Sequence, residues 1–145
     1  FDFNKVTEKS RENPVFYVQY AYARASSVLQ KAKDLGLDVS NLKDIDLTTL
    51  SHDSQINLCK LLVSWPKTLE QSAIHHEPHR IAFYLIDLSS TFHSLWSLGK
   101  SSEELRFFNV SSEKHTLANL SLISAAKIIL GLGLSLLTVS CPEEM

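Results

Sequence analysis

The stretch Asn13–Gly36, NPVFYVQYAYARASSVLQKAKDLG, has the features of one complete amphipathic helix. Asn13 followed by Pro14 is a strong helix start, because Asn caps free backbone N–H groups and Pro is tolerated at the first helical position. Gly36 can close the helix in the left-handed conformation. Between these ends, apolar residues return at spacings of four and three, the period of a helix with one buried face; they are Pro14, Val18, Ala21, Ala25, Val28 and Ala32.

The rest of the chain repeats this plan, with Pro and Gly marking the ends of further helical segments. We expect these segments over about 54–65, 66–76, 78–99 and 112–137. Residues 38–53 are polar and predict a loop with a short turn near 47–50. No segment alternates apolar and polar residues with a period of two, so the prediction is an all-α protein, an antiparallel helix bundle with short connections.

Apolar side chains that recur with the helical period are expected in the core of this bundle. The predicted core consists of Val18, Ala21, Val28, Leu61, Leu62, Trp65, Ile81, Leu85, Leu88, Phe92, Leu122, Ile129 and Leu136.

Bulk composition is that of a soluble globular protein. The 145 residues are 44% hydrophobic and 21% charged, which excludes a disordered or low-complexity chain. Cys59 and Cys141 follow no metal-binding spacing, and although a disulfide between them is possible, a reduced cytoplasmic protein is the simpler interpretation. The net charge of −2 is unfavourable for RNA binding, but residues 1–33 carry six Lys or Arg against three Asp or Glu. A polyanion would therefore bind at this basic helix, and chance clustering of surface charge is the alternative.

The last predicted helix is apolar enough to be compared with a membrane span. Leu120 to Val139 contains a single charge, Lys127, and is long enough to cross a bilayer. A lysine near the centre of a span costs about 2.5–3.5 kcal/mol, and Gly131 and Gly133 lower helix propensity. We therefore expect a central helix of the bundle, buried nearly all round, and no membrane association.

Three blocks of sequence resemble the C-terminal anticodon-binding domain of arginyl-tRNA synthetases, which are class I aminoacyl-tRNA synthetases. They are NPVFYVQYAYAR at 13–24, EPHRIAFYLIDLSSTFH at 77–93 and GLSLLTVSCPEEM at 133–145. The blocks lie in the family's order, cover nearly the whole chain and are most similar in detail to bacterial members. The resemblance implies a DALR-type helical domain over 13–145, with 1–12 as a connector from a catalytic domain.

Three residues depart from the family's pattern. Tyr22 stands where the family usually has His, which removes the hydrogen-bonding group expected there. Asn119 stands where the family usually has the Arg of the DALR motif, so the usual ion pair must be missing or rebuilt. Thr138 replaces a common Gly, so we expect a different terminal turn.

The resemblance also implies a function, which is to bind the anticodon stem-loop of tRNA(Arg) within an enzyme that joins arginine to that tRNA. The sequence contains neither class I ATP-binding signature, no Gly-rich phosphate loop and no nucleophile constellation. We therefore expect no catalytic residue, no cofactor and no activity in this segment alone, with ATP and Mg²⁺ bound elsewhere in the parent enzyme. The expected partners are tRNA(Arg) and the catalytic domain, not DNA. The alternative is a non-enzymatic helical protein-interaction module, motivated by the acidic composition after residue 33.

A second stripe on the first helix has the residue types that bind single-stranded RNA. It consists of Tyr17, Tyr20, Arg24, Ser27 and Lys31, which recur at spacings of three and four. Unpaired bases stack on aromatic rings and guanidinium planes, and the resemblance points to the same helix. We predict that Tyr17, Tyr20 and Arg24 contact the anticodon and that Lys31 contacts phosphate. The alternative is a Tyr-rich flank that packs against a neighbouring helix.

Two other features could be functional. The resemblance implies that the last residue, Met145, lies close to the anticodon loop, and the alternative is a tail that only caps the bundle. His75, His76 and His79 are close in sequence, but Pro78 interrupts the helix between them. We therefore predict a helix junction there and no metal site.

Overall fold

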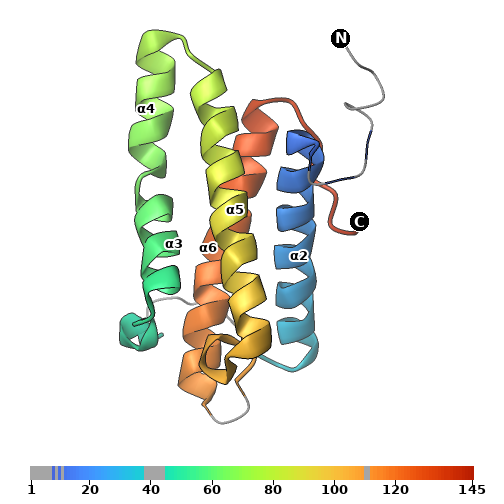
Figure 1. Ribbon diagram of the computed structural model, residues 1–145, viewed down its shortest axis with the longest axis vertical. Helices are drawn as coiled ribbons and strands as arrows, with labels where there is room; N and C mark the ends of the chain where they lie inside the picture. Colours follow the sequence, from blue (N-terminus) through green and yellow to red (C-terminus); the bar gives the residue numbers. More distant parts are fainter. Residues whose placement is uncertain (1–7, 9, 11, 38–44, 110–111) are drawn as a thin grey trace.

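In the part of the chain that the structure describes, the regular structure consists of α-helices and two short 3-10 turns. The computed structural model describes residues 8, 10, 12–37, 45–109 and 112–145. Its helices are α2 (Pro14–Asp34), α3 (Asp53–Val63), α4 (Trp65–His75), α5 (His79–Ser101) and α6 (Glu113–Leu136), and its 3-10 turns are η2 (Leu47–Thr49) and η3 (Glu103–Leu105). Figure 1 shows α3 and α4 end to end as one column, with α5 between this column and α2, and with α6 behind. Each column runs opposite to the next in sequence, so the predicted antiparallel bundle is confirmed.

The helix on which the fold prediction rests, α2, begins and ends as expected. The side-chain oxygen of Asn13 accepts hydrogen bonds from the backbone N–H groups of Val15 and Phe16, at 3.1 and 3.3 Å. Gly36 follows the last turn with a φ of 75°, the left-handed conformation that glycine adopts without strain. The predicted connector lies mostly outside the described residues, which include only 8, 10 and 12 of it.

Two predicted helix ends differ from the structure. Trp65 was expected to end one helix, but Ser64 separates α3 from α4, and Trp65 begins α4 as a buried core residue. Gly99 was expected to close the long helix, but α5 continues to Ser101. The glycine serves close packing instead, because a Cβ at this position would lie 2.8 Å from the backbone oxygen of Leu105 in η3.

The helix α6 supplies eleven of the buried residues but is not buried all round. It is the one described helix that is long and apolar enough to cross a membrane, and 56% of its most apolar window is buried within the bundle. The prediction that this helix is buried nearly all round is wrong, because Leu136, expected in the core, is exposed, as are Ile128 and Leu132. Of the other predicted core residues, Leu61 and Ile129 are half-buried and the remainder are buried.

Asn119 lies inside the bundle, where two side-chain hydrogen bonds satisfy it. Its Oδ1 accepts from Nε2 of Gln55 at 2.8 Å, and its Nδ2 donates to the backbone oxygen of Arg106 at 3.2 Å. Asn119 and Gln55 are both fully buried. A neutral amide pair between α3 and α6 thus occupies the position for which the family resemblance implied an ion pair.

The turn after α6 holds Thr138 in an unfavourable backbone conformation. Its φ is 57°, in the left-handed region that β-branched residues rarely adopt. We expect Thr138→Gly to raise the free energy of unfolding by about 1 kcal/mol, because a strained position of this kind costs about 1–3 kcal/mol and glycine removes the strain. Urea unfolding of both proteins measures the difference. Thr138→Ala, which keeps a Cβ, should gain less, and a glycine variant no more stable than the parent would contradict the prediction.

Tyr84 makes the α3–α4–α5 packing sensitive to high pH. Its hydroxyl donates to the backbone oxygen of Leu61 at 2.8 Å, and burial raises its pKa from 10.0 to about 12. The folded protein therefore holds this proton more tightly than the unfolded chain does between these values.

We expect the contribution of Tyr84 to the free energy of unfolding to be constant below pH 10 and to fall as the pH rises from about 10 to about 12. Chemical unfolding at a series of pH values, compared between the parent and Tyr84→Phe, isolates this contribution. An equal decline in both proteins would show that Tyr84 is not its source.

Candidate nucleic-acid interface

Of the predicted RNA-binding residues of α2, Tyr17, Tyr20 and Arg24 lie against α5, whereas Lys31 is exposed. The rings of Tyr17 and Tyr20 lie 4.8 and 5.5 Å from the ring of His93, centroid to centroid. Tyr17, Tyr20 and Arg24 are half-buried, and His93 is buried between α2 and α5. Tyr17, Tyr20 and Arg24 therefore form one side of a packed aromatic cluster. The alternative prediction, that this stripe packs against a neighbouring helix, is correct for the side that contacts α5.

Arg24 joins this cluster to a second group of aromatic rings. Its guanidinium carbon lies 4.2 Å from the centroid of Tyr20 and 4.7 Å from that of Trp96. One guanidinium nitrogen, Nη1, is 3.4 Å from Nδ1 of His93. Because arginine only donates hydrogen bonds, Nδ1 accepts here. The guanidinium plane is thus held in place by two rings and an imidazole before any ligand binds.

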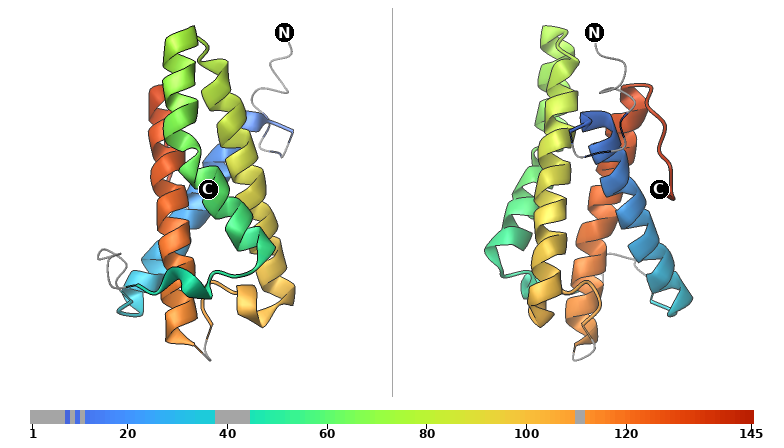
Figure 2. Two further views of the ribbon diagram at one scale, coloured as in Figure 1. Left: turned by 90° about the vertical axis from the view of Figure 1, so that its left-hand side faces the viewer. Right: turned by 45° about the vertical axis from the view of Figure 1, so that its right-hand side comes forward.

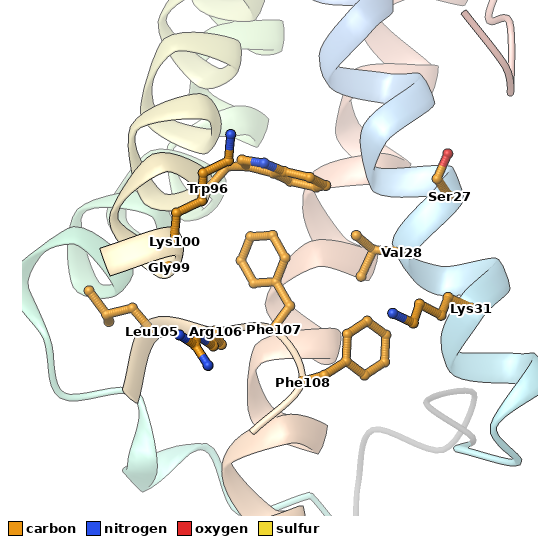
Figure 3. Close-up of a pocket in the computed structure, with 10 residues that line it drawn as sticks. All are labelled: Ser27, Val28, Lys31, Trp96, Gly99, Lys100, Leu105, Arg106, Phe107 and Phe108. Carbon is orange, nitrogen blue, oxygen red and sulfur yellow. The ribbon is translucent and has the colours of Figure 1, made fainter. Parts of the chain in front are cut away.

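Next to Arg24 the surface is hollowed into a mainly apolar cavity of about 440 Å³, which we call the aromatic hollow. Figure 3 shows its lining side chains, with Trp96 from α5 and Phe107 and Phe108 from the segment after η3. The rings of Trp96 and Phe107 meet edge to face at 5.4 Å. Lys31 lies over the ring of Phe108 at 5.2 Å, and Lys100 and Arg106 also line the hollow. Flat apolar walls with cations among them suit a planar aromatic ring next to a phosphate.

Sequence reasoning missed most of this hollow. Trp96 was assigned only to a helix, and Phe107 and Phe108 only to a loop, although Lys100 and Arg106 lie between Trp96 and these two phenylalanines along the chain. Basic residues interleaved with aromatic ones are the signal that could have identified the segment as a nucleic-acid contact.

A second hollow of about 570 Å³ lies on the other side of α2, beside the C-terminal tail. We call it the tail hollow. Its lining is polar, with Lys33 and Lys127 facing the tail carboxylates Glu143 and Glu144. Ser27 and Lys31 line both hollows. Lys31 thus lies where an RNA strand that crosses from one hollow to the other would place its phosphates.

The tail is tied to α2 and α6 by side-chain hydrogen bonds. The Gln19 amide donates to the backbone oxygen and the hydroxyl of Ser140, at 3.0 and 3.1 Å. Lys127 Nζ donates to Glu143 at 3.1 Å. Met145 is exposed beyond these contacts.

Tyr22 lies on a different side of α2 from the site. Its ring faces α6, with Lys127 Nζ 5.4 Å from its centroid, and a Cβ at Gly131 would lie 3.1 Å from its Cε2. Position 22 therefore serves helix packing in this protein. The predicted helix junction is also present, since His75 ends α4 and His79 begins α5.

Comparison with known proteins agrees with this architecture. The sequence pattern of the DALR anticodon binding domain matches residues 18–145. The whole chain is 48% identical to part of an arginine–tRNA ligase from Ruegeria sp. and 49% identical to part of one from Rickettsia rickettsii, and it spans 25% and 26% of their lengths. A solved arginyl-tRNA synthetase structure from Campylobacter jejuni superposes over the whole chain with a TM-score of 0.80 at 24% identity, and 29% of that structure is covered. The chain belongs to the DALR anticodon binding domain family.

Proposed function

We propose that this chain binds the anticodon stem-loop of tRNA(Arg) as the anticodon-reading domain of an arginine–tRNA ligase. The proposal is supported by the identity to arginine–tRNA ligases over the whole chain. The structural observation that carries it is the guanidinium of Arg24, held between Tyr20 and Trp96 at the edge of the aromatic hollow.

The geometry suits a loop of unpaired nucleotides. A base that enters the aromatic hollow can stack on Trp96 or Phe107, and such stacking is worth about 1–3 kcal/mol per base. Arg24 offers a flat cation and further N–H donors next to that base. Lys31 supplies a positive charge for the RNA phosphates that lie over α2 between the two hollows. Base-paired DNA keeps its bases stacked inside the duplex, so it does not offer these surfaces a base.

The chemistry of the parent enzyme belongs to the rest of its chain in this proposal. This segment spans about a quarter of the relatives' length. We assign arginine activation, and with it the ATP and Mg²⁺ sites, to the other three quarters, in a cytoplasmic enzyme. Anticodon binding by this domain would select tRNA(Arg) and hold it while its acceptor end receives arginine.

The test is a filter-binding titration of the full-length enzyme against tRNA(Arg) and against the same tRNA with its anticodon loop replaced. At low salt we expect at least 10-fold weaker binding of the altered tRNA, and we expect affinity for the intact tRNA to fall steeply as salt rises. Equal affinity for both RNAs would refute anticodon recognition. Binding that hardly changes with salt would favour a protein-interaction module.

A further inference from the structure

The outer side of α6 presents a stripe of large apolar side chains to solvent. Ile128, Leu132 and Leu136 are 57%, 51% and 53% exposed. They are four residues apart, so they lie on one face of the helix. We call them the α6 stripe. A contiguous exposed patch of this kind, unlike single exposed leucines, marks an interaction surface.

No charge interrupts the stripe. The only Asp, Glu, Lys or Arg between Leu120 and Val139 is Lys127. Its amino group is turned towards α2 and the tail, where it contacts Glu143 and Tyr22. The solvent-facing side of a surface helix normally carries charged or polar residues. The α6 stripe therefore has the composition of a face that another surface covers.

The stripe lies at the end of the molecule where the chain enters the bundle. An apolar hollow there is lined by Pro14 and Val15 at the start of α2 and by Leu134, Leu137 and Val139 at the end of α6. Figure 1 shows these two helix ends side by side, and the left view of Figure 2 shows α6 at the margin of the bundle, with no described helix outside its upper half. Val15 is itself exposed.

We infer that the α6 stripe is the surface on which the catalytic portion of the same chain docks. The inference rests on the proposed function. Three quarters of the relatives' length lies outside this segment, and that portion precedes the segment in the family order that the resemblance implies. The start of α2 lies beside the end of α6, so a body that precedes α2 begins at the same end of the bundle as the stripe. The contact would fix the distance between the anticodon and the acceptor end of a bound tRNA.

Two other occupants are possible for an apolar helix face, a lipid bilayer and a second copy of the chain. A bilayer is disfavoured because the opposite side of α6 packs within the bundle and eleven of its residues are buried. A second copy would make coverage depend on protein concentration. Both alternatives give results that differ from coverage within one chain.

The test is hydroxyl-radical footprinting of the full-length enzyme without RNA. Leu35, at the other end of the bundle and 61% exposed, is a matched leucine control for Leu132. Docking within one chain predicts that Leu132 is oxidised at least fivefold more slowly than Leu35, at every protein concentration. Equal rates would overturn the inference. So would protection of Leu132 that appears only at high protein concentration or only with vesicles of anionic phospholipid.

A pair of double variants links coverage to function. Ile128→Gln with Leu132→Gln should speed proteolytic cleavage near residues 1–12 about 10-fold and lower aminoacylation, because the two portions separate. Leu35→Gln with Val63→Gln, which alters exposed apolar residues elsewhere, should change neither. Affinity for an isolated anticodon stem-loop should be the same in both variants. If the unmutated enzyme does not bind this stem-loop, the proposed function is refuted rather than the docking surface. Unchanged cleavage in the stripe variant would overturn the docking surface alone.

Discussion

Replacing Arg24 by alanine is expected to weaken binding of the tRNA(Arg) anticodon stem-loop about 30-fold. The substitution removes the flat cation between Tyr20 and Trp96. A hydrogen bond from a charged donor contributes about 1.5–3 kcal/mol, and a loss of about 2 kcal/mol corresponds to about 30-fold in affinity. Filter binding at fixed low salt measures the change, and the melting temperature of each variant shows whether the fold is kept.

Two further variants separate the possible causes. Arg24→Lys keeps the charge but not the fixed fork of N–H donors, so it should bind nearly as weakly as Arg24→Ala if directed hydrogen bonds dominate. Arg80→Ala is a charge-matched control, because Arg80 pairs with Glu77 at the start of α5, away from the aromatic hollow. Wild-type affinity in Arg24→Lys would assign Arg24 the role of a point charge. Wild-type affinity in Arg24→Ala would show that the site is elsewhere.

Asn119→Leu is expected to cause a large loss of stability. Leucine has the same branched arrangement of side-chain heavy atoms but no polar atom, so Nε2 of Gln55 and the backbone oxygen of Arg106 lose their hydrogen bonds to Asn119. Each buried polar group left unsatisfied costs about 1–3 kcal/mol. We expect a loss of about 3 kcal/mol in the free energy of unfolding, or about 6–12 °C in melting temperature. Urea and thermal unfolding measure both, and Asn57→Leu on the exposed side of α3 is the control.

A second substitution tests the explanation. Gln55→Leu together with Asn119→Leu removes both members of the amide pair, so the double variant should lose less than the sum of the two single losses, although Gln55→Leu also removes the acceptor for the backbone N–H of His52. If the two losses simply add, the amide pair is not the source of the effect. In that case the cause is a change in packing.

The backbone plan could be predicted because its signals are local. Asn13-Pro14 and Gly36 enclose α2, and the period of its apolar residues gives the buried face directly. Gly99 was misinterpreted because its role depends on η3. Sequence shows that a glycine is present but not which backbone approaches it. The outward face of α6 was missed for a similar reason, since composition gives the hydropathy of a helix but not what covers it.

The candidate site was only partly predictable. Tyr17, Tyr20 and Arg24 share one face because they share one helix, and the structure brings them together. Trp96 and Phe107 come from α5 and the segment after η3, and no periodicity along α2 indicates which residues pack against it. Tertiary contacts between distant segments therefore determined the aromatic hollow. The predicted roles in RNA binding stay predictions for all five residues, which are Tyr17, Tyr20, Arg24, Lys31 and Met145.

The position of Ser27 and Lys31, shared by the aromatic hollow and the tail hollow, has a consequence for the shape of RNA that can bind. An RNA strand that occupied both hollows would bend over α2 and point successive bases to opposite sides of this helix. A helical stem cannot do this without breaking its pairs, whereas an unpaired loop can. The surface would then select RNA first by the flexibility of its backbone and only afterwards by the identity of its bases. A chemical cross-link that stiffens the loop would abolish binding even with every base unchanged.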